Sequence, residues 1–196
     1  MGKAQETRMV ILQKAFELIY ANGYKTTSID QIIATTQVTK GAFFYHFKTK
    51  DQMGVAIIKD LLMPRLAENI LKPLQTDRNP LEAIYQLIES LLTKNDFLKI
   101  EFGCPVANFT HEMSPWNTDF NKVLKDLISQ WTKAMTETIE NGKGKGFVRN
   151  DVDAGQVTLF VLSGYWGIRN FGKLKNTKAV YKDYLIALKS YLNTLQ

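Results

Sequence analysis

The chain has 196 residues, of which 45% are apolar, a composition typical of a folded protein and not of a disordered one. Its formal charge is +6, and residues 1–50 hold seven Lys and Arg against three Asp and Glu, so the basic excess is concentrated there. One cysteine excludes an intrachain disulfide, and no apolar run is long enough for a membrane span or a signal peptide. We therefore expect a cytoplasmic protein, without membrane contact, whose N-terminal part can bind phosphates.

The first predicted helix covers about residues 7–22. Thr7 can cap its N-terminus, and apolar residues recur at helical spacing as far as Asn22. Gly23 follows, and glycine is a common stop at the C-terminus of a helix. The predicted helix offers an apolar surface on which shorter helices can close.

Two short helices are predicted next, joined by a tight turn. Ser28 can cap the first, and Thr39 can cap the second, which runs to about Phe47. On the second helix Phe43 and Phe47 lie four residues apart and share a face, so the remaining face carries cations, hydrogen-bond donors and rings without a core partner. This arrangement is typical of a helix-turn-helix whose second helix enters a DNA groove. The alternative is an ordinary core helix with aromatic packing.

The stretch TKGAFFYHFKTK, residues 39–50, resembles the recognition helix of the TetR/AcrR family of transcriptional regulators, which commonly reads SKGTLYHYFKSK. The resemblance implies that the protein binds double-stranded DNA. The family usually has Tyr where this chain has Phe44, so only the ring contact is carried over and not the hydroxyl. The DNA-contacting positions that the resemblance implies are Thr27, Ser28, Thr39, Lys40, Gly41, Phe44, Tyr45, His46 and Lys50.

The middle of the chain predicts four more helical segments. One helix begins at Lys50 and runs to about residue 71, where Pro73 would end it, and another covers residues 79–94 behind an Asn-Pro cap. Residues 104–112 predict one or two helical turns. A long helix then opens at Ser114-Pro115 and closes at Asn141-Gly142.

The glycine-rich residues 142–146 lack the spacing of a phosphate-binding loop, so we expect a solvated loop there.

The last two helices are predicted to form a dimer interface. Asp153 and Gln156 can form a capping box, and the helix that follows is apolar nearly all round, so it must be covered on two sides. A final helix covers about residues 177–195 with a second apolar stripe. We expect this pair to complete a four-helix bundle with a second subunit, the alternative being burial within a monomer.

The sequence therefore predicts an all-α fold of about nine helices. Residues 1–49 would form a helix-turn-helix DNA-binding domain, and residues 50–196 would form a helical ligand-binding and dimerisation domain. The function expected is a ligand-responsive repressor that binds an inverted-repeat operator as a homodimer and is released by a small molecule. Aromatic and polar residues that can line the effector cavity are Phe102, Cys104, Asn108, Phe109, His111, Trp116, Asn117, Trp131, Phe160, Tyr165 and Trp166.

Two other classes of function agree less well with the sequence. A helical protein-interaction module would leave the recognition-helix residues unexplained. An enzyme would need converging ionisable groups, and the region of Cys104, His111 and Glu112 is the only one near enough in sequence. His111 and Glu112 are adjacent on a helix and point apart, and two histidines with one cysteine are too few for an ordinary zinc site. We therefore expect no catalytic residues, no metal and no cofactor.

Cys104 carries a separate hypothesis. It precedes Pro105, at the expected N-terminus of a short helix, where backbone N–H groups favour a thiolate that could sense electrophiles. The alternative is a small apolar residue that fills a gap in the core. Exposure of the sulfur decides between the two.

Overall fold

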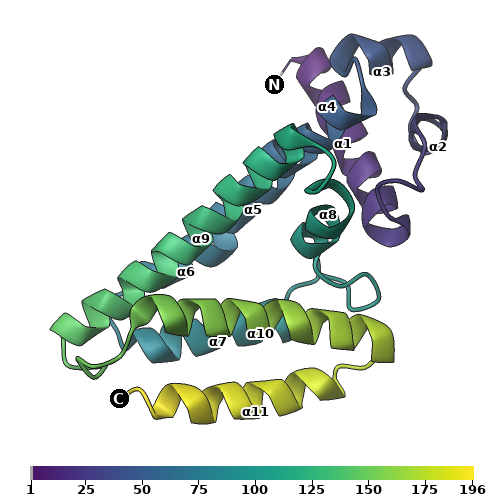
Figure 1. Cartoon of the computed structure of the whole chain (residues 1–196). Coiled ribbons are helices and arrows are strands. Elements are labelled where there is room, and N and C mark those ends of the chain that lie inside the picture. Colours follow the sequence, from purple (N-terminus) through teal and green to yellow (C-terminus); the bar gives the residue numbers. More distant parts are fainter. Residues whose placement is uncertain (1) are drawn as a thin grey trace. The chain divides into compact units, whose positions relative to one another are not determined.

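The computed structural model describes residues 2–196, and this part of the chain is all-helical, without a strand (Figure 1). It contains nine helices when the unbroken run from α4 to α6 is counted as one, which confirms the predicted fold class. None of the helices in residues 2–196 has the length and apolar character needed to cross a membrane. The bounds are α1 Lys3–Asn22, α2 Ile29–Ala34, α3 Lys40–His46, α4 Lys50–Ile57, α5 Met63–Leu66, α6 Lys72–Leu74, α7 Pro80–Thr93, α8 Pro105–Met113, α9 Thr118–Gly144, α10 Ala154–Lys175 and α11 Ala179–Asn193.

The helices pack into two compact units. The first comprises Met1–Arg65 and Pro105–Lys125, so it holds α1 to α4, α8 and the first turns of α9. The second comprises Leu66–Cys104 and Asp126–Gln196, with α7, α10 and α11. The boundary predicted after residue 49 divides the chain by function, and it stays a prediction.

The core of the first unit forms around α1, which packs against α2, α3 and α4. Ile11, Leu12 and Phe16 recur on one face of α1 and are buried, as are Ile32 of α2 and Phe43 of α3. Burying a side chain of this kind contributes about 1.5–3 kcal/mol. Helices as short as α2 and α3, with six and seven residues, are unstable alone and depend on this packing.

In the second unit α11 packs against α7 and α10 (Figure 1). Two glycines of α10 allow the close approach of α11: a Cβ added at Gly172 would lie 2.4 Å from the hydroxyl of Tyr181, and one at Gly164 would lie 2.7 Å from that of Tyr184. At Gly167 of the same helix, by contrast, a Cβ would meet no atom within 4 Å.

The first helix begins earlier than predicted. α1 starts at Lys3, with Gly2 as its N-cap, and Thr7 lies inside the helix. The hydroxyl of Thr7 donates to the carbonyl of Lys3 at 3.0 Å, so it bonds back along the helix instead of capping it. Alanine, glutamine and glutamate in the preceding turn are strong helix formers, which explains the extension.

The helix predicted to end before Pro73 continues through it to Leu74. Two stretches of this run, Ile58–Leu62 and Ala67–Leu71, are π-helical, and each ends two residues before a proline, Pro64 or Pro73. Proline lacks an N–H and its ring crowds the carbonyl four residues back. The wider π-helical turn relieves both problems, so the helix does not have to stop.

The long helix begins at Thr118 and not at Ser114-Pro115. The side-chain oxygen of Asn117 accepts hydrogen bonds from the backbone N–H of Asp119 at 3.0 Å and of Phe120 at 3.2 Å. The cap is therefore Asn117. The Ser-Pro pair lies in the turn between α8 and α9, so its resemblance to the Asn79-Pro80 cap of α7 was misleading.

The end of α9 also differs from the prediction. The helix extends to Gly144, so the first three residues of the stretch 142–146, predicted as a solvated loop, are helical. Gly142 packs so tightly on α7 that an added Cβ would lie 2.4 Å from Pro80, which explains a glycine within the helix. The turn itself uses Gly146, whose φ of 75° lies in the left-handed region.

Candidate DNA-binding face and effector region

Side-chain caps define both helices of the helix-turn-helix. The hydroxyl of Ser28 accepts from the N–H of Gln31 at 3.1 Å, while the Gln31 side chain accepts from the N–H of Ser28 at 2.7 Å, forming a capping box. Thr39 caps α3 by accepting from the N–H of Ala42 at 3.2 Å. Each such cap contributes roughly 1 kcal/mol. The two predicted caps are therefore present.

The outer face of α3 is exposed to solvent. Tyr45 is 73% exposed, Phe44 lies at the edge of the core with its ring against Phe43, and a Cβ at Gly41 would reach only the hydroxyl of Thr39. The surface therefore offers the aromatic rings of Phe44 and Tyr45, the Tyr45 hydroxyl, and backbone without a side chain at Gly41. A helix face of this kind can enter a major groove.

Lys40, on the first turn of α3, forms an exposed ion pair with Asp30 of α2, with 3.0 Å between the ammonium nitrogen and the carboxylate oxygen. Both side chains are well solvated, so the pair is worth less than about 1 kcal/mol and can open for a stronger acceptor. His46, at the end of the helix, lies half-buried with its ring edge-on to Tyr45. Lys40 is therefore exposed to solvent, and His46 is partly exposed.

Two of the predicted contact residues, Thr27 and Lys50, have side chains that make contacts within the protein. Thr27 is 2% exposed, and its hydroxyl donates to the carbonyl of Gly23 at 2.7 Å. Lys50 turns inward: its ammonium donates to the carbonyl of Tyr24 and lies 4.3 Å from the centre of the Tyr24 ring. Burial lowers the pKa of Lys50, and nearby carboxylates offset part of that effect. The structure thus gives both side chains a role in holding the loop between α1 and α2.

The residues proposed for the effector cavity are divided between the two units. The first unit holds Asn108, Phe109, His111, Trp116 and Asn117. The second holds Phe102, Cys104, Trp131, Phe160, Tyr165 and Trp166.

In the first unit the predicted residues have different surroundings. Phe109 is buried in an aromatic cluster, with its ring centre 6.0 Å from Tyr24 and 5.8 Å from Phe120. Trp116 is 75% exposed and lies 5.0 Å from the ammonium of Lys25. With Asn117 and its neighbours it lines an open hollow of about 420 Å³. Phe109 is therefore a core residue, whereas Trp116 lies on the surface.

In the second unit one aromatic pair lies in the interior. Trp131 of α9 and Tyr165 of α10 are buried with their ring centres 5.4 Å apart. The indole nitrogens of Trp131 and Trp166 are buried donors without an acceptor among residues 2–196. Unsatisfied buried donors cost about 1–3 kcal/mol each, so their presence needs an explanation.

Phe160 and Cys104 do not line an interior site. Phe160 projects from the outer face of α10 and is more than half exposed, with its ring 4.5 Å from that of Tyr191. Cys104 is 3% exposed, beside Pro105 at the first position of α8. The buried, gap-filling interpretation of Cys104 is therefore the one that the structure supports.

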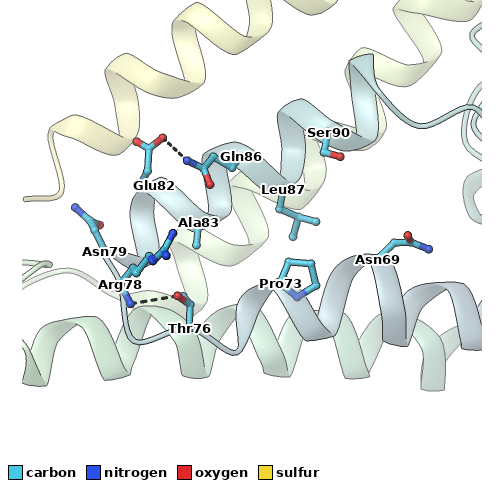
Figure 2. A pocket seen from close by; sticks show the side chains of 10 residues that line it. All are labelled: Asn69, Pro73, Thr76, Arg78, Asn79, Glu82, Ala83, Gln86, Leu87 and Ser90. Carbon is cyan, nitrogen blue, oxygen red and sulfur yellow. Dashed lines mark hydrogen bonds between the residues drawn. The ribbon is translucent and has the colours of Figure 1, made fainter.

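A separate cavity of about 540 Å³ lies in the second unit beside α6 and α7 (Figure 2). The predicted effector residues are not among those that line it. Seven of its ten lining residues have polar side chains. Two hydrogen bonds join lining residues to each other, from the Gln86 side chain to Glu82 and from the N–H of Arg78 to the Thr76 hydroxyl. The lining residues are Asn69, Pro73, Thr76, Arg78, Asn79, Glu82, Ala83, Gln86, Leu87 and Ser90.

The outer surface of the last two helices is unusually apolar. Four large side chains of α10 and one of α11 are between 56% and 82% exposed: Leu159, Phe160, Phe171, Leu174 and Ile186. The opposite face of α10 is buried in its own unit through residues such as Val157 and Val161. As predicted, α10 has an apolar face on each side.

Sequence reasoning missed the roles of Glu112 and Asp51. Glu112 of α8 accepts hydrogen bonds from two backbone N–H groups of the loop after α1, and Asp51 of α4 accepts from Tyr24 and Asn117. The partners of Glu112 lie 88 and 87 residues away, so no local pattern could have indicated them. Among the described residues no group of three His, Cys, Asp or Glu side chains is placed to hold a metal ion.

Comparison with known proteins matches both parts of the chain. Residues 11–57 match the model of bacterial regulatory proteins of the tetR family, and residues 80–188 match the tetracyclin repressor-like C-terminal domain. An uncharacterized HTH-type transcriptional regulator in the lacX 3′ region of Lactococcus lactis subsp. lactis is 29% identical over 163 residues, covering 82% of this chain and 81% of that protein. The HTH-type transcriptional repressor DhaR of a Mycobacterium species is 22% identical over 167 residues, covering 82% and 79%.

Solved structures agree in fold. A TetR transcriptional regulator from Chloroflexus aurantiacus superposes with a TM-score of 0.88 at 23% identity, over 100% of this chain and 98% of that one. A TetR-family regulator from Cytophaga hutchinsonii gives the same TM-score of 0.88 at 19% identity, over 100% and 98%. Because the C-terminal family model alone spans more than half of the chain, and the N-terminal model covers the helix-turn-helix, the chain belongs to the TetR family of transcriptional regulators.

Proposed function

We propose that this TetR-family regulator is a cytoplasmic repressor that binds an inverted-repeat operator as a homodimer and leaves it when a small molecule binds. In this proposal residues 1–49 read the DNA and residues 50–196 hold the effector and the dimer contact. The observation that carries the proposal is the capped α3 with an exposed, aromatic and cationic outer face, in a chain of this family. Ser28, Thr39, Lys40, Gly41, Phe44, Tyr45 and His46 are the proposed contact residues.

Operator binding is tested by footprinting on the DNA flanking the gene, followed by titration at several salt concentrations. The proposal expects two protected half-sites related by a two-fold axis, because a two-fold dimer presents two identical recognition helices. It also expects affinity to fall steeply with salt, since phosphate neutralisation releases counterions. Protection of a single unrepeated half-site would contradict it.

The homodimer is proposed to form through α10 and α11. Large apolar side chains so exposed on one face are costly in water, and a second copy of the same face would cover them. Leu174→Glu should shift the mass in sedimentation from dimer to monomer. Ser129→Glu adds the same charge at an exposed position of α9 and should leave the dimer intact.

An effector is proposed to bind inside the second unit next to Trp131 and Tyr165. The buried indole N–H of Trp131 supports this, because an acceptor on a flat or apolar compound would satisfy it. Screening a metabolite library by thermal shift and by operator release tests the idea. Trp131→Phe keeps a ring but removes the donor, so it should weaken the compounds found. If the unaltered protein and the Trp131→Phe variant bind every compound with equal affinity, the effector binds elsewhere, for example in the cavity of Figure 2.

Neither alternative function gains support. The family points to a regulator and not to an enzyme. Glu112, which the sequence offered as one member of a catalytic cluster, is held by two backbone N–H groups, and Cys104 is buried. A protein-interaction module would not account for the match of residues 11–57 to a DNA-binding family.

A further inference from the structure

The loop between α1 and α2 is held by a carboxylate from the far end of α8. One oxygen of Glu112 accepts from the N–H of Tyr24 at 3.1 Å, and the other accepts from the N–H of Lys25 at 3.0 Å. Bonds from backbone N–H groups to a carboxylate are charge-assisted and stronger than neutral ones. The half-buried Glu112 therefore fixes this loop to α8, although the two are remote in sequence.

Gly23 lets the loop close around this carboxylate. Its φ of 98° is one that L side chains rarely adopt, and an added Cβ would lie 3.3 Å from either oxygen of Glu112. A further hydrogen bond, from the Thr27 hydroxyl to the Gly23 carbonyl at 2.7 Å, lies within the loop itself. The backbone conformation and the carboxylate thus fit one another.

A second contact holds the other end of the helix-turn-helix. Asp51, in the first turn of α4, accepts from the hydroxyl of Tyr24 at 2.6 Å with one oxygen and from the side-chain amide of Asn117 at 2.9 Å with the other. The side-chain oxygen of the same Asn117 caps α9. Burial, with Asp51 nearby, raises the pKa of Tyr24, so its hydroxyl stays a donor at any pH in the working range.

The packing next to these contacts is tight, so α4 has little room to shift against Phe120 and Tyr24. A Cβ added to Gly54 of α4 would lie 2.4 Å from the ring of Phe120 and 2.7 Å from that of Tyr24. The two rings meet edge-on, with 5.1 Å between their centres. The start of α4, the loop after α1 and the start of α9 are therefore in direct contact.

These contacts lie on both sides of α2 and α3 in the sequence. α2 and α3 begin after the loop that Glu112 holds and end where Asp51 opens α4. The geometry points to Glu112 and Asn117 as positioning residues, which do not touch DNA but hold α2 and α3, from both ends, in the orientation that binds the operator. This inference rests on the proposed function, since it assigns a role in the same DNA-binding reaction. A protein that populates the competent orientation only in part binds its operator more weakly by that same fraction.

The test uses Asn117→Asp, because aspartate caps a helix as well as asparagine does. The substitution keeps the acceptor for α9 but places a second carboxylate against Asp51. Operator affinity should fall about tenfold, the size expected when a hydrogen bond to a charged group is lost. Non-specific affinity for a scrambled duplex and its salt dependence should not change, because the outer face of α3 is untouched.

The double variant Asp51→Asn with Asn117→Asp supplies the rescue. It reverses the direction of the hydrogen bond: the amide introduced at position 51 donates to the new carboxylate while its oxygen still accepts from Tyr24. Operator affinity should return to within about twofold of the original, as expected for a bond restored between the same two positions. Glu112→Gln provides an independent probe, because its amide nitrogen would face a backbone N–H, and it should also lose operator affinity about tenfold. Lys122→Gln, at an exposed position of α9, is the control.

The outcomes distinguish failure of the proposed function from failure of the positioning role of Glu112 and Asn117. If the unaltered protein binds no operator selectively, the proposed function fails. If it binds but Asn117→Asp and Glu112→Gln bind the operator equally well, the positioning role is wrong. If both variants lose specific and non-specific binding alike, together with a lower melting temperature, the contacts are merely structural and the inference is overturned. Loss of operator binding without rescue in the double variant would also overturn it.

Discussion

Replacement of Arg169 should destabilise the second unit more than any surface change. Arg169 lies on the inner face of α10, is 0% exposed, and donates to the carbonyls of Lys99 at 2.9 Å, of Gly103, and of Leu98 at the longer distance of 3.5 Å. Its guanidinium also lies 5.8 Å from the centre of the Tyr181 ring. A single side chain thus ties the segment between α7 and α8 to α10.

The magnitude follows from the contacts. Arg169→Met keeps the unbranched stem of the side chain and removes the guanidinium with its donors. The two shorter hydrogen bonds, each worth about 1.5–3 kcal/mol because the donor is charged, set a loss of about 3–6 kcal/mol. Removing the buried charge recovers part of its desolvation cost, so we expect a net loss of about 2–4 kcal/mol. For a chain of this size that corresponds to a melting temperature lower by roughly 5–15 °C.

The assay is thermal and urea unfolding at one fixed protein concentration, because dimerisation contributes to apparent stability. Lys175→Met, at an exposed position of the same helix, removes the same charge and should change stability by less than about 0.5 kcal/mol. An Arg169→Met protein that melts at the same temperature as the Lys175→Met control would refute the reasoning, since the buried Gly103 carbonyl and the part-buried carbonyls of Leu98 and Lys99 would then have lost their donor at no cost.

Three further changes have clear expected outcomes. Gly172→Ala should lower the melting temperature, because its Cβ would lie 2.4 Å from the Tyr181 hydroxyl and must push α11 away; an unchanged melting curve would contradict the packing. Lys40→Ala should leave stability within about 0.5 kcal/mol but reduce discrimination between operator variants, measured by competition binding. The hydrogen bond from Lys189 lowers the pKa of Glu82, so this pair stabilises the fold above the ordinary pKa of glutamate and ceases to do so as pH falls through the lowered value; Lys189→Met should therefore flatten the acid limb of a stability–pH curve.

Caps and periodicity carried most of what could be predicted. Ser28, Thr39, Asn79 and Asp153 each accept a backbone N–H at the start of their helices, and a cap needs only neighbours within three residues, so sequence shows it. Local patterns gave the wrong helix start where two candidate N-caps lay close together in sequence. At Ser114-Pro115 an apparent cap lay three residues before a better one, and only the turn geometry after α8 decides which is used.

The candidate site was less predictable because its contacts are long-range. Which residues of α3 are exposed can be predicted from the four-residue spacing of Phe43 and Phe47, because that spacing defines the buried face of a single helix. In contrast, the inward turn of Lys50 depends on Tyr24, 26 residues earlier, and the loop contact of Glu112 depends on a residue 88 positions away. The sequence alone does not show whether a charged side chain faces a phosphate of DNA or a carbonyl of the protein. The physical difference lies in the partner that folding brings to it.

The exposed apolar face of α10 and α11 leads to a last prediction, about DNA affinity. If two copies bind one operator, the dimer contacts the phosphates of both half-sites, and the slope of log affinity against log salt is proportional to the number of phosphates neutralised. A monomeric Leu174→Glu protein keeps the α3 face intact but can occupy only one half-site at a time. Its salt slope on a single half-site should therefore be about half that of the dimer on the full operator.

The affinity of this monomer should also fall by much more than twofold, because binding of the second half-site is no longer intramolecular and its effective concentration is lost. Ser129→Glu, with the same change in charge, should keep both the full slope and the full affinity, which excludes simple charge repulsion from DNA as the cause. A protein that sediments as a monomer and yet shows the full slope would mean that one chain contacts the whole operator. The exposed face of α10 would then need another partner.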